Sequence, residues 1–302
     1  MANWRIIPVN HDNAAAFVAY CRAHGAEHDE SFLPQADFVP TAEYPAYLML
    51  AGEGGDGIVG AACLLRTPGY VNMGIARFMI LHAVEPSRAA YAALLDALMP
   101  HMADLDYAFG FIPEDRTAVR AIWEDLGLRV ERYAFVLEHP GAPVPAVQLP
   151  EGMGFQHVHE SDQEALATFC DLLNISFAGQ PQRADATPER LVREIVGPYG
   201  LPDGLLLLWV DGRPVGTVSV ERDDEPGAAA IGGVTVHPAY RGRGLGRLLI
   251  RQALNVAAAA GLRPVYLSVS ANNEAAICLY VREGFEKKTV MVAYRWEPGD
   301  AA

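Results

Sequence analysis

Lysine is nearly absent from this chain of 302 residues, which holds only Lys287 and Lys288. Basic residues number 23 against 37 acidic ones, so the formal net charge is −14. Residues 1–145 carry 9 basic and 18 acidic side chains, and residues 146–302 carry 14 and 19. Because phosphate backbones require clustered positive charge, we expect no nucleic-acid partner for either half. An acidic chain suits a cationic partner such as an amine, but acidity is also common among soluble proteins.

Long hydrophobic runs are missing as well. The strongest apolar run, Leu205–Val210, is six residues long, whereas a membrane helix needs roughly 18. The first residues contain no apolar stretch of secretory length, so we expect no signal peptide, no membrane contact and a cytoplasmic location. The four cysteines are far apart and form no Cys-x-x-Cys pair. They predict reduced, mostly buried thiols and no cysteine zinc site.

Proline is concentrated at one place in the chain. Pro140–Pro150 contains four prolines in eleven residues and no hydrophobic periodicity. Such a composition is typical of an extended linker. We therefore expect one domain over residues 1–140, a linker over 141–150 and a second domain over 151–302.

Hydrophobic periodicity and turn residues predict mixed α/β structure in the second half. The expected elements are helices at 161–177, after Thr187, at 245–260 and at 274–283, and strands at 205–210, 214–221, 228–237, 265–269 and 288–296. Ser161, with Glu164 three residues on, predicts a capping box, and Thr187-Pro188 predicts a capped helix start. Asp211-Gly212 predicts a tight hairpin turn.

The first half repeats this order with one informative gap. Ile58-Val59-Gly60 matches Pro214-Val215-Gly216, and Val84-Glu85-Pro86 matches Val236-His237-Pro238. Trp123 later matches Tyr280, and the first copy is five residues shorter between these landmarks. The missing residues correspond to a glycine-rich turn of the second copy. Two copies of one fold are therefore expected, one of them without the turn.

That turn, Arg241-Gly242-Arg243-Gly244-Leu245-Gly246, lies between a predicted strand and a predicted helix. Glycine permits a sharp bend and close backbone approach, and the start of a helix offers free N–H groups to an anion. Side chains of Arg241, Arg243 or Arg247 can add charge-assisted hydrogen bonds. No Gly-Lys-Ser/Thr follows, and the spacing is not Gly-x-Gly-x-x-Gly, so the turn is neither a Walker loop nor a dinucleotide fingerprint.

Three motifs in order resemble the GNAT superfamily of acyl-CoA-dependent N-acetyltransferases. They are Val234-Thr235-Val236-His237-Pro238 with Arg241-x-x-Gly244-x-Gly246, then Leu267-x-Val269-x-x-x-Asn273, and finally Leu279-Tyr280-x-x-x-Gly284-Phe285. The resemblance implies two tandem GNAT-like domains, each a splayed mixed β-sheet flanked by helices. The N-terminal copy resembles the fold only in outline and is expected to be degenerate and non-catalytic.

The same resemblance implies a binding site for acetyl-CoA or another acyl-CoA, and no metal. The backbone of Val234 and Val236 would pair with the pantetheine arm, and Asn273 would contact the cofactor nearby. The pyrophosphate would be held by backbone groups of the turn and the helix start, namely Arg241, Gly242, Arg243, Gly244, Gly246 and Arg247. Substrate choice in this fold is set by the early helices and their loop, here about residues 171–199.

Tyr280 is the expected general acid. Attack of an amine on a thioester expels a thiolate, and a phenol with an ordinary pKa of about 10 is protonated at neutral pH and can donate to it. Without the motif, Tyr280 would be interpreted as a half-buried aromatic residue of an amphipathic helix. The first copy has Trp123 there, and an indole cannot serve as that acid.

The general base is less clearly marked, because the strand before the turn reads Ala230-Ile231-Gly232-Gly233, with no carboxylate. Glu221 at the end of the neighbouring strand is the candidate, with a solvated hairpin residue as the alternative. His237 has a suitable pKa but is expected only to shape its turn. His157 and His159 lack further ligands nearby, so no metal site is expected there.

The sequence thus predicts an acyl-CoA-dependent N-acyltransferase that acts on a primary amine by direct attack, in the C-terminal domain. The acceptor is a small-molecule or peptide amine, and the protein a monomer or homodimer. Two alternatives stay open: a non-catalytic acyl-CoA-binding or scaffolding protein, and a transferase that uses another acyl donor.

Overall fold

The computed structural model describes residues 4–29, 32–52, 57–142, 144–180, 182–183 and 185–298. It divides into two compact units, which we call unit 1 and unit 2. Unit 1 comprises residues 1–134 and 290–302, and unit 2 comprises residues 135–289. Each unit is a mixed α/β structure, as the sequence predicts. Every helix among the described residues is too short or too polar to cross a bilayer.

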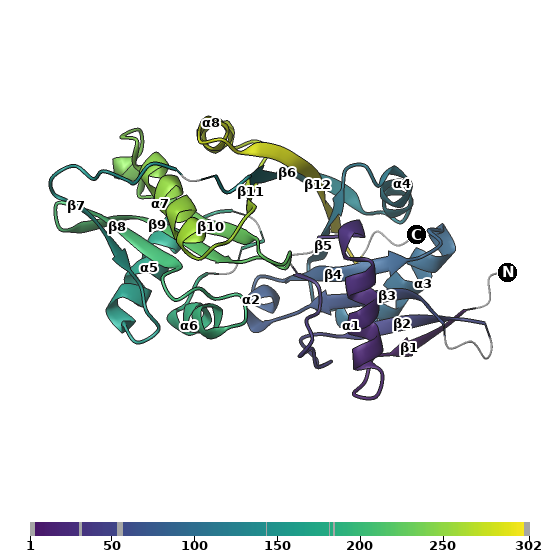
Figure 1. Cartoon of the computed structure of the whole chain (residues 1–302). Helices are drawn as coiled ribbons and strands as arrows, with labels where there is room; N and C mark the ends of the chain where they lie inside the picture. The colour runs from purple at the N-terminus through teal and green to yellow at the C-terminus, as the bar shows by residue number, and fades with distance from the viewer. Residues whose placement is uncertain are drawn as a thin grey trace. The chain divides into compact units, whose positions relative to one another are not determined.

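Unit 1 is built around strands in the spatial order β1-β2-β3-β4-β5-β12 (Figure 1). Its elements are β1 (Trp4–Pro8), α1 (Ala14–Ala23), η1 (Gly25–Glu27), β2 (Ala46–Ala51), β3 (Ile58–Leu65), α2 (Pro68–Val71), β4 (Ile75–Ala83), α3 (Arg88–Leu98), η3 (Met99–His101), β5 (Tyr107–Pro113) and α4 (Thr117–Asp125). Neighbouring strands are antiparallel except β4 and β5, which are parallel.

Unit 2 has strands in the order β6-β11-β10-β9-β8-β7 (Figure 1). Its elements are β7 (Met153–His157), α5 (Gln163–Ser176), α6 (Pro188–Val196), β8 (Leu205–Val210), β9 (Arg213–Arg222), β10 (Ala229–Val236), η4 (Pro238–Tyr240), α7 (Leu245–Ala259), β11 (Val265–Ser270) and α8 (Glu274–Arg282). The only parallel pair that the registers give in this unit is β10 with β11. Helix α7 packs on β9 and β10, and α5 packs on the same two strands and on α6.

Two strands run from one unit into the other. The strand β6 (Arg129–His139) belongs to unit 2 from Phe135 onward, and β12 (Glu286–Trp296) belongs to unit 1 from Val290 onward. Each half of the chain therefore supplies the last strand of the other half's sheet. The compact units differ in this respect from the expected ranges 1–140 and 151–302, because hydrophobic pattern reveals a strand but not the sheet edge that it joins.

The hydrophobic core of each unit includes residues of the strand, β6 or β12, that comes from the other half of the chain. In unit 1, Val292, Tyr294 and Trp296 of β12 are buried together with Trp123 of α4. In unit 2, Leu137 of β6 is buried in the core beneath α7. Burial of large apolar side chains is the main stabilising contribution to folding, so each unit depends on a strand supplied by the other half of the sequence.

Local signals explain most element boundaries. Asp211 and Gly212 both have positive φ, 49° and 73°, as a two-residue hairpin turn of type I′ requires. Thr187 Oγ1 accepts a hydrogen bond from the Arg190 N–H at 3.3 Å and caps α6, as predicted. The expected cap of α5 at Ser161 is wrong by one residue. Asp162 Oδ1 accepts instead, from the Ala165 N–H at 3.0 Å, because a carboxylate at that position also favours the helix dipole.

The repeat seen in the sequence is visible in the packing of its glycines. Gly60 lies on β3 and Gly216 on β9, the equivalent strands of the two units. A Cβ atom on Gly60 would lie 3.0 Å from the carbonyl oxygen of His82, and one on Gly216 would lie 2.8 Å from that of Thr235. Both strands therefore require glycine where they cross closely over the next strand.

Candidate active site

The sheet of unit 2 opens between its two parallel strands. β10 pairs with β11 only at Ala229–Ile231, and its register with β9 shifts between Gly232 and Thr235. Gly233 has φ of +55° at this irregularity, a conformation that favours glycine. The backbone of Val234 follows it, beyond the last residue paired with β11. This is the splayed sheet that the sequence predicts, and Val234 and Val236 lie on its diverging strand.

The glycine-rich turn follows that strand after the short helix η4. Gly242 and Gly244 both have φ of +77°, and no other atom lies within 4 Å of a Cβ placed on either. Gly244 is the N-cap of α7 and has no side chain that could accept from the first-turn N–H groups. The Arg247 N–H bonds to the Gly244 carbonyl at 3.1 Å, but no side chain caps the N–H groups before it at the positive end of the helix dipole. Uncapped helix starts of this kind bind phosphate groups. The turn thus has the form of an anion cradle.

The arginine side chains of the turn have partners within the protein. The guanidinium of Arg241 donates from Nε to the Val236 carbonyl at 3.1 Å, and Arg243 donates to the Ala239 carbonyl at 3.3 Å. Arg247 pairs with Glu283 through Nε at 2.7 Å, and Arg251 pairs with the same carboxylate at 2.6 Å. These side chains therefore shape and anchor the turn. From the sequence alone we expected them as possible ligands of an anion.

Glu283 is a structural residue of the site that the sequence analysis missed. Its side chain is 3% exposed and joins the first two turns of α7 to the end of α8. A buried carboxylate needs such charged partners, since an unpaired one would be costly to desolvate. In the sequence, Glu283 stands out only as an acidic residue directly before Gly284-Phe285, and this position does not reveal its partners.

The second half of helix α8, which carries Tyr280, packs against the start of α7, and Asn273 lies at the other end of α8. A Cβ atom on Gly246 would lie 3.1 Å from the Leu279 side chain, so glycine allows the two helices to approach closely. Asn273 Oδ1 accepts from the Ala276 N–H at 3.2 Å and caps α8. Tyr280 is 7% exposed, and burial raises its pKa to about 12. Its phenol is therefore protonated at neutral pH and can act as a proton donor, but not as a base.

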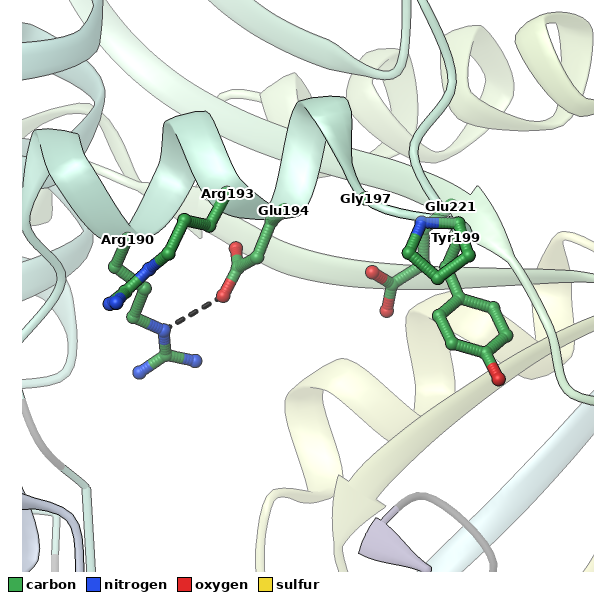
Figure 2. Close-up of a pocket in the computed structure, with 7 residues that line it drawn as sticks. Arg190, Arg193, Glu194, Gly197, Tyr199 and Glu221 are labelled. Carbon is green, nitrogen blue, oxygen red and sulfur yellow. Dashed lines mark hydrogen bonds and ion pairs between the residues drawn. The ribbon is translucent and has the colours of Figure 1, made fainter. Parts of the chain in front are cut away.

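Glu221 lies in a pocket of about 320 Å³ formed with α6 and the loop after it. Successive residues of a strand face opposite sides, and Val220 is buried in the core beneath α7, so Glu221 faces the α6 side. Figure 2 shows Arg190, Arg193 and Glu194 projecting from α6 into the space that the Glu221 carboxylate shares. Tyr199 completes this group of lining residues.

The environment of Glu221 shifts its ionisation. Glu221 is exposed on β9, but partial desolvation by its surroundings, followed by the negative charges of Glu194 and Asp223, raises its pKa to about 7. Arg190 opposes this shift, but its guanidinium is engaged by Glu194, with Nε 2.7 Å from Oε1. A carboxylate with a pKa near neutrality is suited to accept a proton. The sequence named Glu221 and the range 171–199, which contains Arg190, Arg193 and Tyr199, but only the fold brings these residues beside Glu221.

Other expectations for single residues can be compared with the structure. His237 Nδ1 accepts from the Ala239 N–H at 3.3 Å, so the histidine shapes its turn as expected. Three of the four cysteines are buried, and Cys278 on α8 is exposed. In unit 1, Trp123 is 1% exposed and lies among the core aromatics Phe78 and Tyr294.

Comparisons with known proteins agree with this geometry. Residues 169–285 match the family model described as the acetyltransferase (GNAT) family. A mycothiol acetyltransferase of Thermobispora bispora is 30% identical over 238 residues, covering 77% of this chain and 74% of that protein. A mycothiol acetyltransferase of Rhodococcus jostii is 31% identical over 199 residues, covering 62% of this chain and 63% of that protein. The chain thus spans less than two thirds of the length of several curated relatives that it matches.

A solved structure supports the fold over the whole chain. The tandem GNAT protein from the clavulanic acid biosynthesis pathway superposes with a TM-score of 0.71 at 19% identity. The superposition covers 99% of this chain and 100% of that protein. Both copies of the repeat are therefore GNAT folds, and the relatives, the family model and the opened sheet lead to one conclusion. The chain belongs to the acetyltransferase (GNAT) family.

Proposed function

We propose that the chain transfers the acetyl group of acetyl-CoA to a primary amine of a small molecule, and that this chemistry takes place in unit 2. The observation that carries the proposal is the side-chain-free N-cap Gly244, placed after a strand that has left its parallel partner. A cradle for phosphates and an unpaired strand edge for an extended chain of amides suit the two ends of a coenzyme A thioester. Unit 1 has neither glycine at the equivalent turn.

The proposed reaction is direct attack of the amine on the thioester carbonyl. An ammonium group must first lose a proton, and Glu221, with its pKa raised to about 7, is the proposed acceptor of that proton. The nitrogen then forms the new bond to the acetyl carbon, the carbon–sulfur bond breaks, and the Tyr280 phenol gives its proton to the departing thiolate. The nitrogen loses one further proton to become an amide, and this proton restores the Tyr280 phenol through solvent. A backbone N–H of Val234 would polarise the carbonyl as charge develops on its oxygen.

The pocket beside Glu221 is the proposed acceptor site. Its volume of about 320 Å³ is at the lower end of the range of small-molecule pockets. It offers carboxylates to an ammonium group and the guanidinium of Arg193 to a polar or anionic part of the acceptor. The acceptor of the mycothiol acetyltransferases is the first compound to be tried, because several relatives carry that name.

The test is an isothermal titration of acetyl-CoA into the full chain, followed by an assay of free thiol release with a panel of primary amines. One site per chain and amine-dependent thiol release are the expected results. Binding without release for any amine would favour an acyl-CoA-binding scaffold. Absence of binding would refute the use of acetyl-CoA, and two sites per chain would refute the assignment of unit 1 as degenerate.

A further inference from the structure

Three histidines and a glutamate gather in unit 1, apart from the candidate active site. His24, Glu27 and His28 lie on the short turn at the end of α1, which includes η1, and His82 lies on β4. Residues three apart in a 3-10 turn lie on the same side, which places the His24 and Glu27 side chains together. β4 pairs with β5 only up to Arg77, so His82 lies where the sheet of unit 1 opens.

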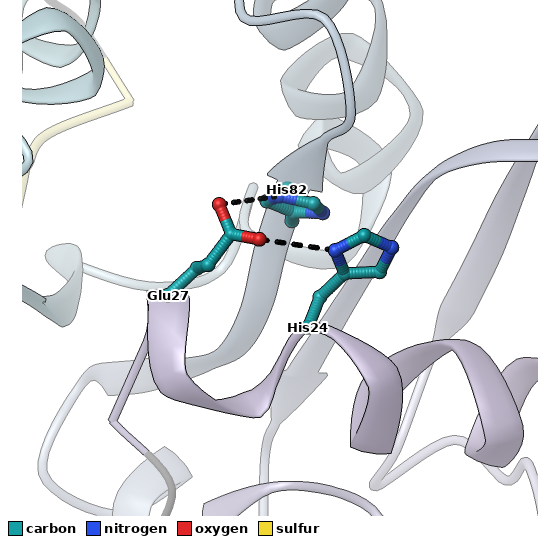
Figure 3. Close-up of side chains that lie close together, drawn as sticks. All are labelled: His24, Glu27 and His82. Atoms are coloured by element: carbon teal, nitrogen blue, oxygen red, sulfur yellow. Dashed lines mark hydrogen bonds and ion pairs between the residues drawn. The ribbon is translucent and has the colours of Figure 1, made fainter.

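The Glu27 carboxylate lies between two imidazoles (Figure 3). Its Oε1 is 3.1 Å from His24 Nδ1, and its Oε2 is 3.5 Å from His82 Nε2. One donor atom from each of the three residues lies within 4.8 Å of the other two. A tetrahedral zinc ion with bonds of about 2.0–2.2 Å holds its ligand atoms roughly 3.4 Å apart. Small side-chain movements would therefore bring all three donors onto one ion.

The donor set has the chemistry that zinc prefers. Two imidazole nitrogens and one carboxylate form a common three-ligand set, which leaves a further position on the metal. His82 is 3% exposed, so its ring is fixed inside the unit.

Two neighbouring groups fit a metal site independently of these three residues. The hydroxyl of Tyr20 is 2.6 Å from His82 Nδ1, which holds the ring with Nε2 toward Glu27. Hydrogen bonds of this kind orient metal-binding histidines. His28 is 7% exposed, and its Nε2 is buried without a hydrogen-bond partner among the described residues. Its ring meets that of His82 edge-on, with centroids 5.0 Å apart.

One residue of the cluster opposes a cation. Arg116 is 3.5 Å from Glu27 Oε2, and its side chain is 40% exposed. Its positive charge competes with a metal ion for the carboxylate. Because the side chain is long and partly in solvent, it can turn away when an ion binds.

We propose that unit 1 contains a binding site for a divalent transition metal of the zinc class, formed by His24 Nδ1, the Glu27 carboxylate and His82 Nε2. Tyr20 is a positioning residue for His82, and the buried ring of His28 packs edge-on against the His82 ring. The ion would tie the turn after α1 to β4. The sequence predicted no metal, from the cysteines and from His157 and His159 alone, and did not consider the residues of this cluster.

The test is a titration of chelator-treated full chain with Zn²⁺ by calorimetry and with Co²⁺ by visible absorption. One ion per chain and the absorption of four-coordinate cobalt are expected. His24→Gln and Glu27→Gln should each weaken binding by at least about tenfold, and Tyr20→Phe by about 10- to 100-fold. His159→Gln, at an exposed histidine of unit 2, is the matched control and should leave binding unchanged.

Arg116→Gln gives a readout that loss of structure cannot imitate, because it should tighten zinc binding. Circular dichroism of each variant checks that the chain is folded, and Zn²⁺ should raise the melting temperature of the parent but not of Glu27→Gln. No binding of either ion would overturn the proposal. Binding that survives both His24→Gln and Glu27→Gln would overturn it as well, since the ion would then lie elsewhere.

Discussion

The chain enters two equivalent helices, α3 of unit 1 and α7 of unit 2, in different ways. In unit 2, β10 ends at Val236 and α7 begins at Leu245, with Gly242 and Gly244 in the left-handed region between them. In unit 1, β4 ends at Ala83 and α3 begins at Arg88, after a connection without glycine. Both helices pack on the equivalent strands, α3 on β3 and β4, and α7 on β9 and β10. The packing helix is therefore retained, whereas the turn before it is not.

The N-caps show what the missing glycines change. Ser87 Oγ accepts from the Ala90 N–H at 3.3 Å, so unit 1 satisfies one of its own helix-terminal donors. Gly244 has no side chain, so the equivalent Arg247 N–H bonds to the Gly244 carbonyl at 3.1 Å, and no side chain caps the N–H groups of Leu245 and Gly246. A serine cap stabilises the helix, whereas a glycine cap keeps the terminus open to an anion. The same fold thus holds one helix start built for stability and one built for binding.

Trp123 of unit 1 and Tyr280 of unit 2 occupy matching positions but differ in chemistry. Both are buried residues of the helix before the last strand of their half. The Trp123 ring contacts Phe78 and Tyr294 in the core of unit 1, and its indole has no acidic proton suited to a thiolate. Tyr280 keeps a phenolic proton at neutral pH. Unit 1 therefore lacks both the turn and the acid on which the proposed reaction depends.

Replacement of the proposed acid should have the largest effect. Tyr280→Phe removes the phenolic proton donor while preserving the ring, so kcat should fall by about 10²- to 10⁴-fold with little change in the Kd of acetyl-CoA. Tyr266→Phe is the matched control, because its hydroxyl bonds to Glu225 and Lys288 and has no role in the proposed reaction. Steady-state kinetics with calorimetry separates the two quantities. An active Tyr280→Phe enzyme would mean that unit 2 uses another acid.

Closing the open helix start should abolish cofactor binding. Gly244→Glu forces a side chain onto a left-handed residue and places a negative charge where the phosphates would lie, so acetyl-CoA should bind at least about 100-fold more weakly. Gly261→Glu has the same strain, with φ of +71°, and the same charge, but lies after the other end of α7. This control should bind normally by calorimetry. Equal losses in both variants would indicate general destabilisation instead.

The pH profile should distinguish the proposed base. Because the pKa of Glu221 is raised to about 7, the carboxylate that accepts the proton accumulates as the pH rises through 7, and kcat/KM should rise with it. Glu221→Gln should lower kcat/KM by about tenfold at pH 8 and abolish its rise near pH 7. Glu194→Gln removes a negative charge that raises the pKa of Glu221, so the rise in kcat/KM should move to lower pH. A profile unchanged in Glu221→Gln would assign the base to another group.

Replacement of the α3 cap Ser87 should have the smallest effect of the four, and it tests the comparison of the two helix N-caps directly. Ser87→Ala removes the hydrogen bond to the Ala90 N–H and should lower the free energy of unfolding by about 1 kcal/mol. Ser87→Gly copies the residue type of the α7 N-cap and should lower the free energy of unfolding by only about a few tenths of a kcal/mol. Urea unfolding measures both, and acetyl-CoA binding should be the same in each. A large loss of binding in either variant would show that unit 1 takes part in the cofactor site.

Much of the candidate site follows from short stretches of sequence. Local sequence sets three of its features: the turn around Gly242 and Gly244, the α8 cap Asn273 and the position of Tyr280. Each depends on neighbours within a few residues and not on contacts between distant parts of the chain. The acceptor pocket was only partly predicted. Glu221 and residues 171–199 were named, but the hairpin composition around Glu221 favours a solvated side chain. Glu221 is indeed exposed on β9. Its position beside α6 and its raised pKa arise from residues distant in sequence.

The sequence by itself determined the order of elements, the internal repeat, the glycine turn and the family, because periodicity and left-handed glycines are properties of local chain. Only the tertiary structure decided the exchange of β6 and β12, the pairing of Glu283 with Arg247 and Arg251, and the meeting of His82 with Glu27. These features depend on which strand edges pair and which side chains meet across long loops. A strand edge accepts any chain of suitable register through the same backbone hydrogen bonds, so hydrophobic pattern alone does not select the partner.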